Sequence, residues 1–184
     1  QWLKAAGADA AESFDQAAPP AAVVVWSIAK VNAGQRAAAP AILEYVRAGG
    51  RVVVLDQLNW DWPELAGLKV TTFFTSELGG TSRVFQAQGM GRHPLLAGVL
   101  PEMLHRWNGL PGAAAECYIE APGDAEARVI LWAEDPRRAV ALSLPIGKGE
   151  ILACQVKAKD RLYGKSYDPA AEQVMLNLLA PVPR

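Results

Sequence analysis

The sequence predicts an α/β domain with a mainly parallel central sheet and additional antiparallel strands in the C-terminal third. Three observations predict this class. A helix, a glycine turn and a buried strand follow one another in Ala37–Asn59. An earlier apolar run, Val23–Trp26, supplies a second buried strand, and the last third of the chain alternates strand-like runs with turns. Strand–helix–strand units build parallel sheets, whereas short connections favour antiparallel pairs.

The helix of this central unit is predicted by its apolar spacing. Four apolar residues recur at i, i+3, i+4 and i+7 and form one stripe: Ala39, Ile42, Leu43 and Val46. We expect the helix to span Ala37–Ala48 and to end at Gly49-Gly50, because glycine adopts the left-handed conformation that follows a helix. Pro40 fits only if it lies in the first turn, where a missing N–H costs nothing.

The strand after the glycine turn is expected to lie inside the sheet. Val52–Leu55 is apolar without alternation, which is typical of a strand covered on both faces. With Val23–Trp26 and the helix between them it forms a βαβ unit, whose crossover should be right-handed.

The middle of the chain has a different pattern. Asn59–Pro63 reads as a polar-aromatic loop, and Val70–Phe74 and Arg83–Ala87 as short strands separated by a Gly79-Gly80 turn. A short helix is expected at Pro101–Arg106.

The last third is expected to be largely β, and to close with a helix. Its strand candidates are Cys117–Glu120, Arg128–Ala133, Ala139–Leu144 and Glu150–Val156. Pro145–Gly149 is a hairpin-type loop, and the second and third candidates pair across Asp135-Pro136. Asp168-Pro169 then opens a helix with an N-cap acceptor and a proline at its first position. Its apolar stripe consists of Ala171, Met175, Leu178 and Leu179.

Length and composition limit what the protein can be. Its 184 residues suffice for one domain with a substantial core, spanning residues 1–184. The net charge is −1 and the charges are interspersed, which argues against a nucleic-acid or anionic-membrane partner. No run approaches the length of a membrane span. Gln1–Ala6 reads as the end of an amphipathic helix, so we expect the chain to be part of a longer multidomain protein.

The two cysteines and two histidines do not form a recognisable reactive site. Cys117 and Cys154 are too few for a disulfide framework, and both lie in strand-like segments, so we expect buried free thiols. His93 and His105 lack clustered acids, so no metal site is predicted.

Three stretches resemble one superfamily. They are YVRAGGRVVVLDQ at Tyr45–Gln57, HPLLAGVLPEMLHRW at His93–Trp107, and a closing segment from Gly147–Ala158 to Asp168–Leu179. Together they are similar to class I glutamine-amidotransferase-like domains, which are accessory parts of β-galactosidase-type glycoside hydrolases. The resemblance implies a flavodoxin-like three-layer sandwich. It also implies that glycosidase chemistry belongs to a separate catalytic domain.

The catalytic residues of an active amidotransferase are not matched. Such an enzyme needs a cysteine on a tight strand-to-helix turn and a later histidine–glutamate pair. After Val52–Leu55 the chain continues with Asp56-Gln57-Leu58-Asn59, which contains no thiol or hydroxyl. We therefore predict no catalytic residue, no cofactor and no enzyme activity for this domain alone. The acids Asp56, Asp61 and Glu64 are read as solvated or loop-capping residues.

One group of polar and aromatic residues could bind a ligand. Its residues follow the central strand, where ligands of open α/β sheets usually bind: Asp56, Gln57, Asn59, Trp60 and Trp62. Tryptophan faces stack on sugars, and nearby amides and carboxylates bind hydroxyl groups. Tryptophans are equally suited to packing against a neighbouring domain. Both readings stay open.

The leading functional hypothesis is a non-catalytic accessory domain of a glycoside hydrolase, acting in domain packing, assembly or substrate-side shaping. Its partners would be the other domains of the parent enzyme, and self-association stays open. The first alternative is a carbohydrate-binding module that uses Trp60 and Trp62. The second is a sugar-processing enzyme of the same superfamily, which would need His93, His105 and Asp56 in one pocket.

Overall fold

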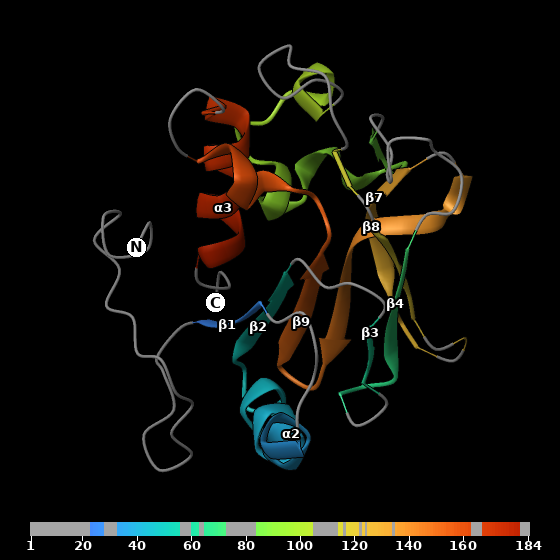
Figure 1. Ribbon diagram of the computed structural model, residues 1–184, viewed down its shortest axis with the longest axis vertical. Helices are drawn as coiled ribbons and strands as arrows, with labels where there is room; N and C mark the ends of the chain where they lie inside the picture. Colours follow the sequence, from blue (N-terminus) through green and yellow to red (C-terminus); the bar gives the residue numbers. More distant parts are fainter. Residues whose placement is uncertain are drawn as a thin grey trace.

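The computed structural model describes residues 23–27, 33–55, 60–62, 65–72, 84–104, 114, 115, 117–121, 123, 125–133, 135–162 and 167–180. Within these residues a mixed sheet of nine strands carries two α-helices and several short 3₁₀ helices (Figure 1). The helices are α2 (Ala33–Arg47), α3 (Pro169–Leu179), η1 (Met90–Arg92), η2 (Pro94–Leu96), η3 (Pro101–Leu104) and η5 (Ala158–Arg161).

The strands are β1 (Val23–Ser27), β2 (Arg51–Leu55), β3 (Trp60–Trp62), β4 (Leu68–Thr72), β5 (Phe85–Gln86), β6 (Cys117–Glu120), β7 (Arg128–Ala133), β8 (Asp135–Ile146) and β9 (Gly149–Cys154). The main path of the sheet has the order β1-β2-β9-β8-β6-β4-β3, while β7 pairs with β8 and β5 with β7. The α/β class predicted from the sequence is confirmed.

The prediction of a mainly parallel sheet needs correction. Among the described strands, only β1, β2 and β9 pair in parallel. The other pairings are antiparallel. The reason is the length of the connections. A parallel crossover needs a dozen or more residues, whereas β8 and β9 are joined by the two-residue turn Gly147-Lys148.

The parallel strands form the middle of three layers. Val52 and Val54 of β2 belong to one hydrophobic cluster with Ile42 and Val46 of α2. Their neighbours on β2 belong to a second cluster with Ala171, Val174 and Leu178 of α3. Because successive residues of a strand point to opposite faces, α2 and α3 cover opposite faces of the parallel strands (Figure 1).

Helix α2 confirms the predicted apolar stripe but begins one turn early. It starts at Ala33, so Pro40 lies in its interior rather than in its first turn. Alanine is the strongest helix former, and the alanine-rich segment before Pro40 extends the helix despite the proline. The helix ends as predicted, because Gly49 has a φ of 116°.

The antiparallel part departs most from the sequence predictions. Trp60–Trp62, expected in a loop, forms edge strand β3 and pairs with β4. The strand expected at Val70–Phe74 is found at Leu68–Thr72, and the helix expected at Pro101–Arg106 is the 3₁₀ helix η3. The predicted pairing across Asp135-Pro136 is confirmed, although β8 is much longer than expected.

Strands β9 and β6 share one edge of β8. Along the other edge, β7 pairs with β8. On the shared edge, β9 pairs with residues 141–146 of β8, and β6 meets β8 at Ala139. Leu68 and Val70 of β4 belong to one cluster with Val54 of β2. The antiparallel strands β4 and β6 therefore contribute to the core on the face that α2 covers.

The C-terminal helix forms as predicted. Asp168 accepts hydrogen bonds from the backbone N–H groups of Ala170 and Ala171, and Pro169 is the first helical residue. No helix in the described part of the chain is long and apolar enough to span a membrane.

Candidate functional site

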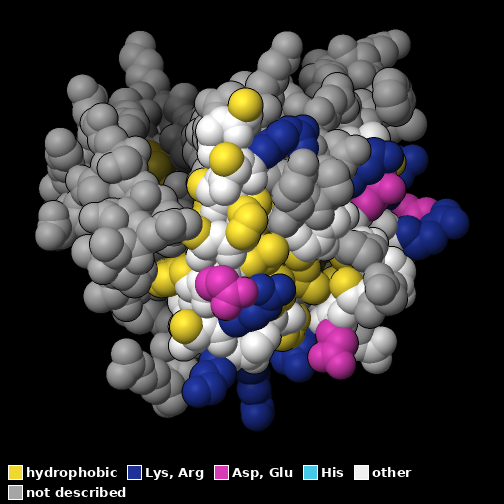
Figure 2. All heavy atoms as spheres, turned by 90° about the horizontal axis from the view of Figure 1, so that it is seen from below, with side chains coloured by type: hydrophobic (Ala, Val, Ile, Leu, Met, Phe, Trp, Pro, Cys, Tyr) yellow, Lys and Arg dark blue, Asp and Glu magenta, His cyan; other side chains and the backbone are white. Residues whose placement is uncertain are grey.

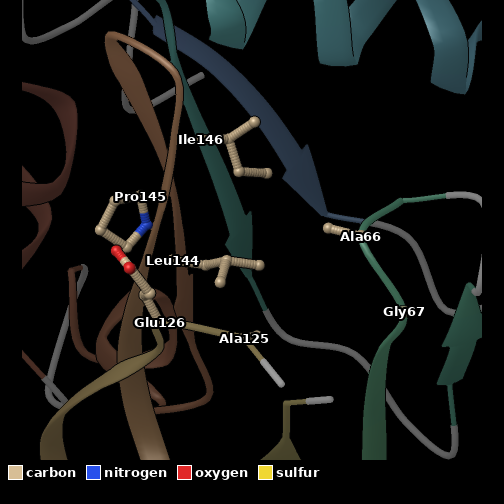
Figure 3. A pocket seen from close by; sticks show the side chains of 7 residues that line it. All are labelled: Ala66, Gly67, Ala125, Glu126, Leu144, Pro145 and Ile146. Carbon is tan, nitrogen blue, oxygen red and sulfur yellow. The ribbon is translucent and has the colours of Figure 1, made fainter. Parts of the chain in front are cut away.

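A hollow of about 410 Å³ opens beside the turn that precedes β4 (Figure 3). Three segments line it: the turn itself, the loop before β7 and the end of β8. The lining residues are Ala66, Gly67, Ala125, Glu126, Leu144, Pro145 and Ile146. Ala66 has a φ of 58°, a left-handed conformation that a residue with a Cβ adopts only at a cost in free energy. The hollow therefore lies between segments that are far apart in the sequence.

The side chains that line the hollow are mainly apolar. Ala66, Ala125 and Ile146 pack against the cluster under α2, and Glu126 is the one ionisable residue of the lining. Figure 2 shows the lower face of the molecule, where hydrophobic side chains lie among basic and acidic ones. The lining therefore offers a single carboxylate for acid–base chemistry.

The recognition residues predicted from the sequence are only partly described. Asp56, Gln57 and Asn59 lie outside the described residues. For Trp60 and Trp62 the structure describes the backbone, which places them on β3 at the edge of the sheet. Trp60 is paired with Val70, and Trp62 with Leu68. Whether the five residues form one site stays a prediction.

Both cysteines are buried and free, as predicted. They belong to the two different hydrophobic clusters and therefore lie on opposite faces of the sheet. Burial raises the pKa of the Cys154 thiol to about 12. Because the thiolate is the reactive form, Cys154 is unsuited to act as a nucleophile at neutral pH.

His93 has a local structural contact. It lies between η1 and η2, and its Nδ1 accepts a hydrogen bond from the backbone N–H of Leu95 at 3.2 Å. Burial lowers the pKa of His93 below its ordinary value, so the ring is neutral at pH 7 and can accept this bond. His105 lies outside the described residues. Among the residues that are described, no three His, Cys, Asp or Glu side chains gather as metal ligands.

The comparison with known proteins rests on structure. No family model matches the sequence, and no curated protein sequence is a significant match. Solved structures do share this fold. The cytoplasmic protein STM3548 from Salmonella typhimurium matches with a TM-score of 0.51 and 15% identity, over 89% of this chain and 76% of that one. The exo-β-1,4-mannosidase Op5Man5 from Opitutaceae bacterium strain TAV5 matches with a TM-score of 0.50 and 10% identity, over 89% of this chain and 26% of that one.

Glycoside hydrolases recur among these neighbours. A cold-adapted β-galactosidase from Rahnella sp. R3 matches at 17% identity and a TM-score of 0.44, over 85% of this chain and 22% of that one. At such identities the two matches with TM-scores of 0.50 and 0.51 show a shared fold alone. The chain spans about a quarter of the length of the mannosidase.

Sequence reasoning missed a buried polar network on the face covered by α3. Arg51 is only 2% exposed, and its Nε donates to Oε1 of Glu150 at 2.8 Å. The second carboxylate oxygen of Glu150 accepts from the hydroxyl of Ser143 at 2.7 Å. Arg51 also donates through Nη1 to the backbone carbonyl of Ala180, just past α3. The sequence does contain one sign of this network. A charged residue lies at or near the start of each of two apolar strands, Arg51 in β2 and Glu150 in β9.

Proposed function

We propose that this chain is a non-catalytic accessory domain of a larger glycoside hydrolase, of the glutamine-amidotransferase-like, flavodoxin-like type. Its role would be domain packing, assembly or shaping of the substrate side of the parent enzyme. Its partners would be the other domains of that enzyme.

The observation that carries this proposal is the match to the mannosidase. The alignment includes 89% of this chain but only 26% of the mannosidase, as expected for one domain of a multidomain hydrolase. The parallel strands β1, β2 and β9 between α2 and α3 agree with the three-layer arrangement that the sequence resemblance implies.

The chemistry of the described residues supports a non-catalytic role. Cys117 and Cys154 are buried within strands rather than exposed on a strand-to-helix turn. The lining of the hollow offers one carboxylate, Glu126, whereas glycoside hydrolysis uses two.

The test begins with the natural gene product. Its intact mass should exceed that of the 184-residue chain, and it should hydrolyse at least one member of a panel of nitrophenyl glycosides. The isolated chain should hydrolyse none of them and should release no ammonia from glutamine. Deleting this domain from the natural product should change its oligomeric state or its activity. Turnover by the isolated chain, or a natural product no longer than the chain, would refute the proposal.

The carbohydrate-binding alternative depends on Trp60 and Trp62. Residues directly opposite each other in an antiparallel pair lie on the same face of the sheet. The partners of these tryptophans, Val70 and Leu68, are buried in the cluster under α2. The register of β3 therefore favours packing over a sugar platform.

Tryptophan fluorescence distinguishes these readings. We expect no saturable change when the isolated chain is titrated with a panel of oligosaccharides. The matched variants are Trp60→Ala and Trp62→Ala. A saturable shift in the wild type that either substitution abolishes would replace the accessory-domain proposal with a carbohydrate-binding module.

A further inference from the structure

Helix α3 is held in its last turn by a polar contact with the segment that contains η2. Asn177 is 9% exposed, and its Nδ2 donates to the backbone carbonyls of Leu95 at 2.9 Å and Ala97 at 2.8 Å. Gln173, one turn earlier, donates to the side-chain oxygen of Asn177 at 2.9 Å. The position of α3 therefore depends on where residues 95–97 place their carbonyl groups.

The shape of that segment depends in turn on His93. Its Nδ1 accepts from the N–H of Leu95, and its carbonyl accepts from the N–H of Leu96 at 2.8 Å. The first of these bonds requires an unprotonated Nδ1, because an imidazolium ring has two donors and no acceptor. The same ring thus orients the backbone whose carbonyls hold Asn177.

Three charged residues from three strands act on His93. They are Glu150 of β9, Arg51 of β2 and Arg128 of β7. Two of them, Arg51 and Glu150, also belong to the network that binds the carbonyl of Ala180 beyond the end of α3.

We propose that His93 is a pH-sensitive switch that controls how firmly the η2 segment holds α3. Neutral His93 accepts the Leu95 N–H and fixes the carbonyls of Leu95 and Ala97 for Asn177. Protonated His93 loses this bond and adds a cation near Arg51 and Arg128, while Glu150 attracts it. The η2 segment and the C-terminal half of α3 then open together more often.

The sign of the pH dependence follows from burial. Burial lowers the pKa of His93 below its ordinary value of 6.5, while Glu150 acts in the opposite direction. A depressed folded-state pKa means that the unfolded chain binds the proton more readily. The stabilisation by His93 is therefore complete above pH 6.5 and is lost as the pH falls through the folded-state pKa.

Amide hydrogen exchange tests the switch in the intact chain. The rates, corrected for intrinsic chemistry, are compared at about pH 8 and about pH 5, on either side of the ordinary histidine pKa. We expect exchange in Leu95–Val99 and Val174–Ala180 to rise about fivefold at the lower pH, the effect of losing one capping hydrogen bond. The amides of Ile42–Val46 in α2 serve as the internal reference and should not change.

Two variants complete the experiment. His93→Asn keeps a capping acceptor that does not titrate in this range, so its exchange should not respond to pH. His93→Ala removes the acceptor, so α3 should exchange faster at both pH values. An unchanged wild type at low pH, or an equal response in His93→Asn, would overturn the proposal. Either result is independent of whether the domain belongs to a glycoside hydrolase.

Discussion

The parallel and antiparallel parts of the sheet reach stability in different ways. In the parallel part, β2 and β9 are buried on both faces between α2 and α3, and a buried ion pair joins Arg51 of β2 to Glu150 of β9. In the antiparallel part, β8 pairs with β6, β7 and β9, and its pairing with β7 has repeated register shifts. Local sequence pattern determines the structure of the first part, whereas long-range strand pairing and register determine that of the second. Substitutions in the two parts should therefore have unequal effects.

The largest effect is expected where the parallel part is most tightly packed. A Cβ at Gly149 would lie 2.1 Å from the carbonyl oxygen of Gly50 and 2.3 Å from that of Val46. Backbone atoms cannot yield as a flexible side chain can, so Gly149→Ala should lower the free energy of unfolding by at least about 4 kcal/mol. Urea denaturation measures the change.

Gly123 supplies the control. A Cβ there meets no atom within 4 Å, so Gly123→Ala should leave the midpoint of denaturation unchanged. Equal stability of the two variants would contradict the close contact between the start of β9 and the end of α2.

The next effect compares one ion pair from each part. Arg51 and Glu150 have side chains only 3% and 15% exposed, whereas Lys69 and Glu120, 3.9 Å apart, are 54% and 44% exposed. Arg51→Met leaves a buried carboxylate without its cation and should cost about 3 kcal/mol. Lys69→Met should change the free energy of unfolding by less than about 0.5 kcal/mol.

A double variant separates the value of the buried pair from the cost of breaking it. Arg51→Met with Glu150→Met removes both charges, so it should be more stable than Arg51→Met alone. A double variant as unstable as the sum of its two parents would mean that Arg51 and Glu150 act independently.

A smaller effect is expected at the start of α3. Asp168 accepts from two backbone N–H groups there, so Asp168→Ala should cost about 1 kcal/mol, the usual value of an N-cap. Asp168→Asn retains an acceptor and should lose less. If both variants have the same thermal midpoint as the wild type, the Asp168 cap does not stabilise α3 and the prediction is wrong.

The smallest expected effect is none at all. Cys117, in the antiparallel part, and Cys154, in the parallel part, are both buried, and burial raises the pKa of Cys154 to about 12. Neither thiol of the native protein should react with a thiol reagent near neutral pH, while both should react in denaturant. Rapid labelling of Cys117 alone would reveal that the antiparallel part opens locally.

The parallel part could be predicted because its pattern is local. The unbroken apolar run of β2, the stripe of α2 and the Asp168 cap each appear within a few residues of sequence. The prediction that Pro40 lies in the first turn is wrong, because the alanines before it extend α2 toward its N-terminus.

The antiparallel part and the buried network depend on residues far apart in the sequence. Trp60–Trp62 forms a strand only because β4 pairs with it, and a three-residue run has no clear period of its own. Arg51 and Glu150 are separated by 99 positions, and Arg51 and Ala180 by 129. No local pattern places such residues together. The hollow beside Ala66 is lined by three segments far apart in the sequence, so no local pattern predicts it either.

The central position of β9 also has a consequence for biosynthesis. This strand lies between β2 and β8, so it joins the two parts of the sheet. A ribosome adds it about a hundred residues after β2, at a few to a few tens of residues per second. Until then β2 has only β1 beside it, and one edge of an apolar strand stays open. The nascent chain therefore exposes that edge for several seconds, and the opposite face of the sheet from α2 is covered only after α3 has been made.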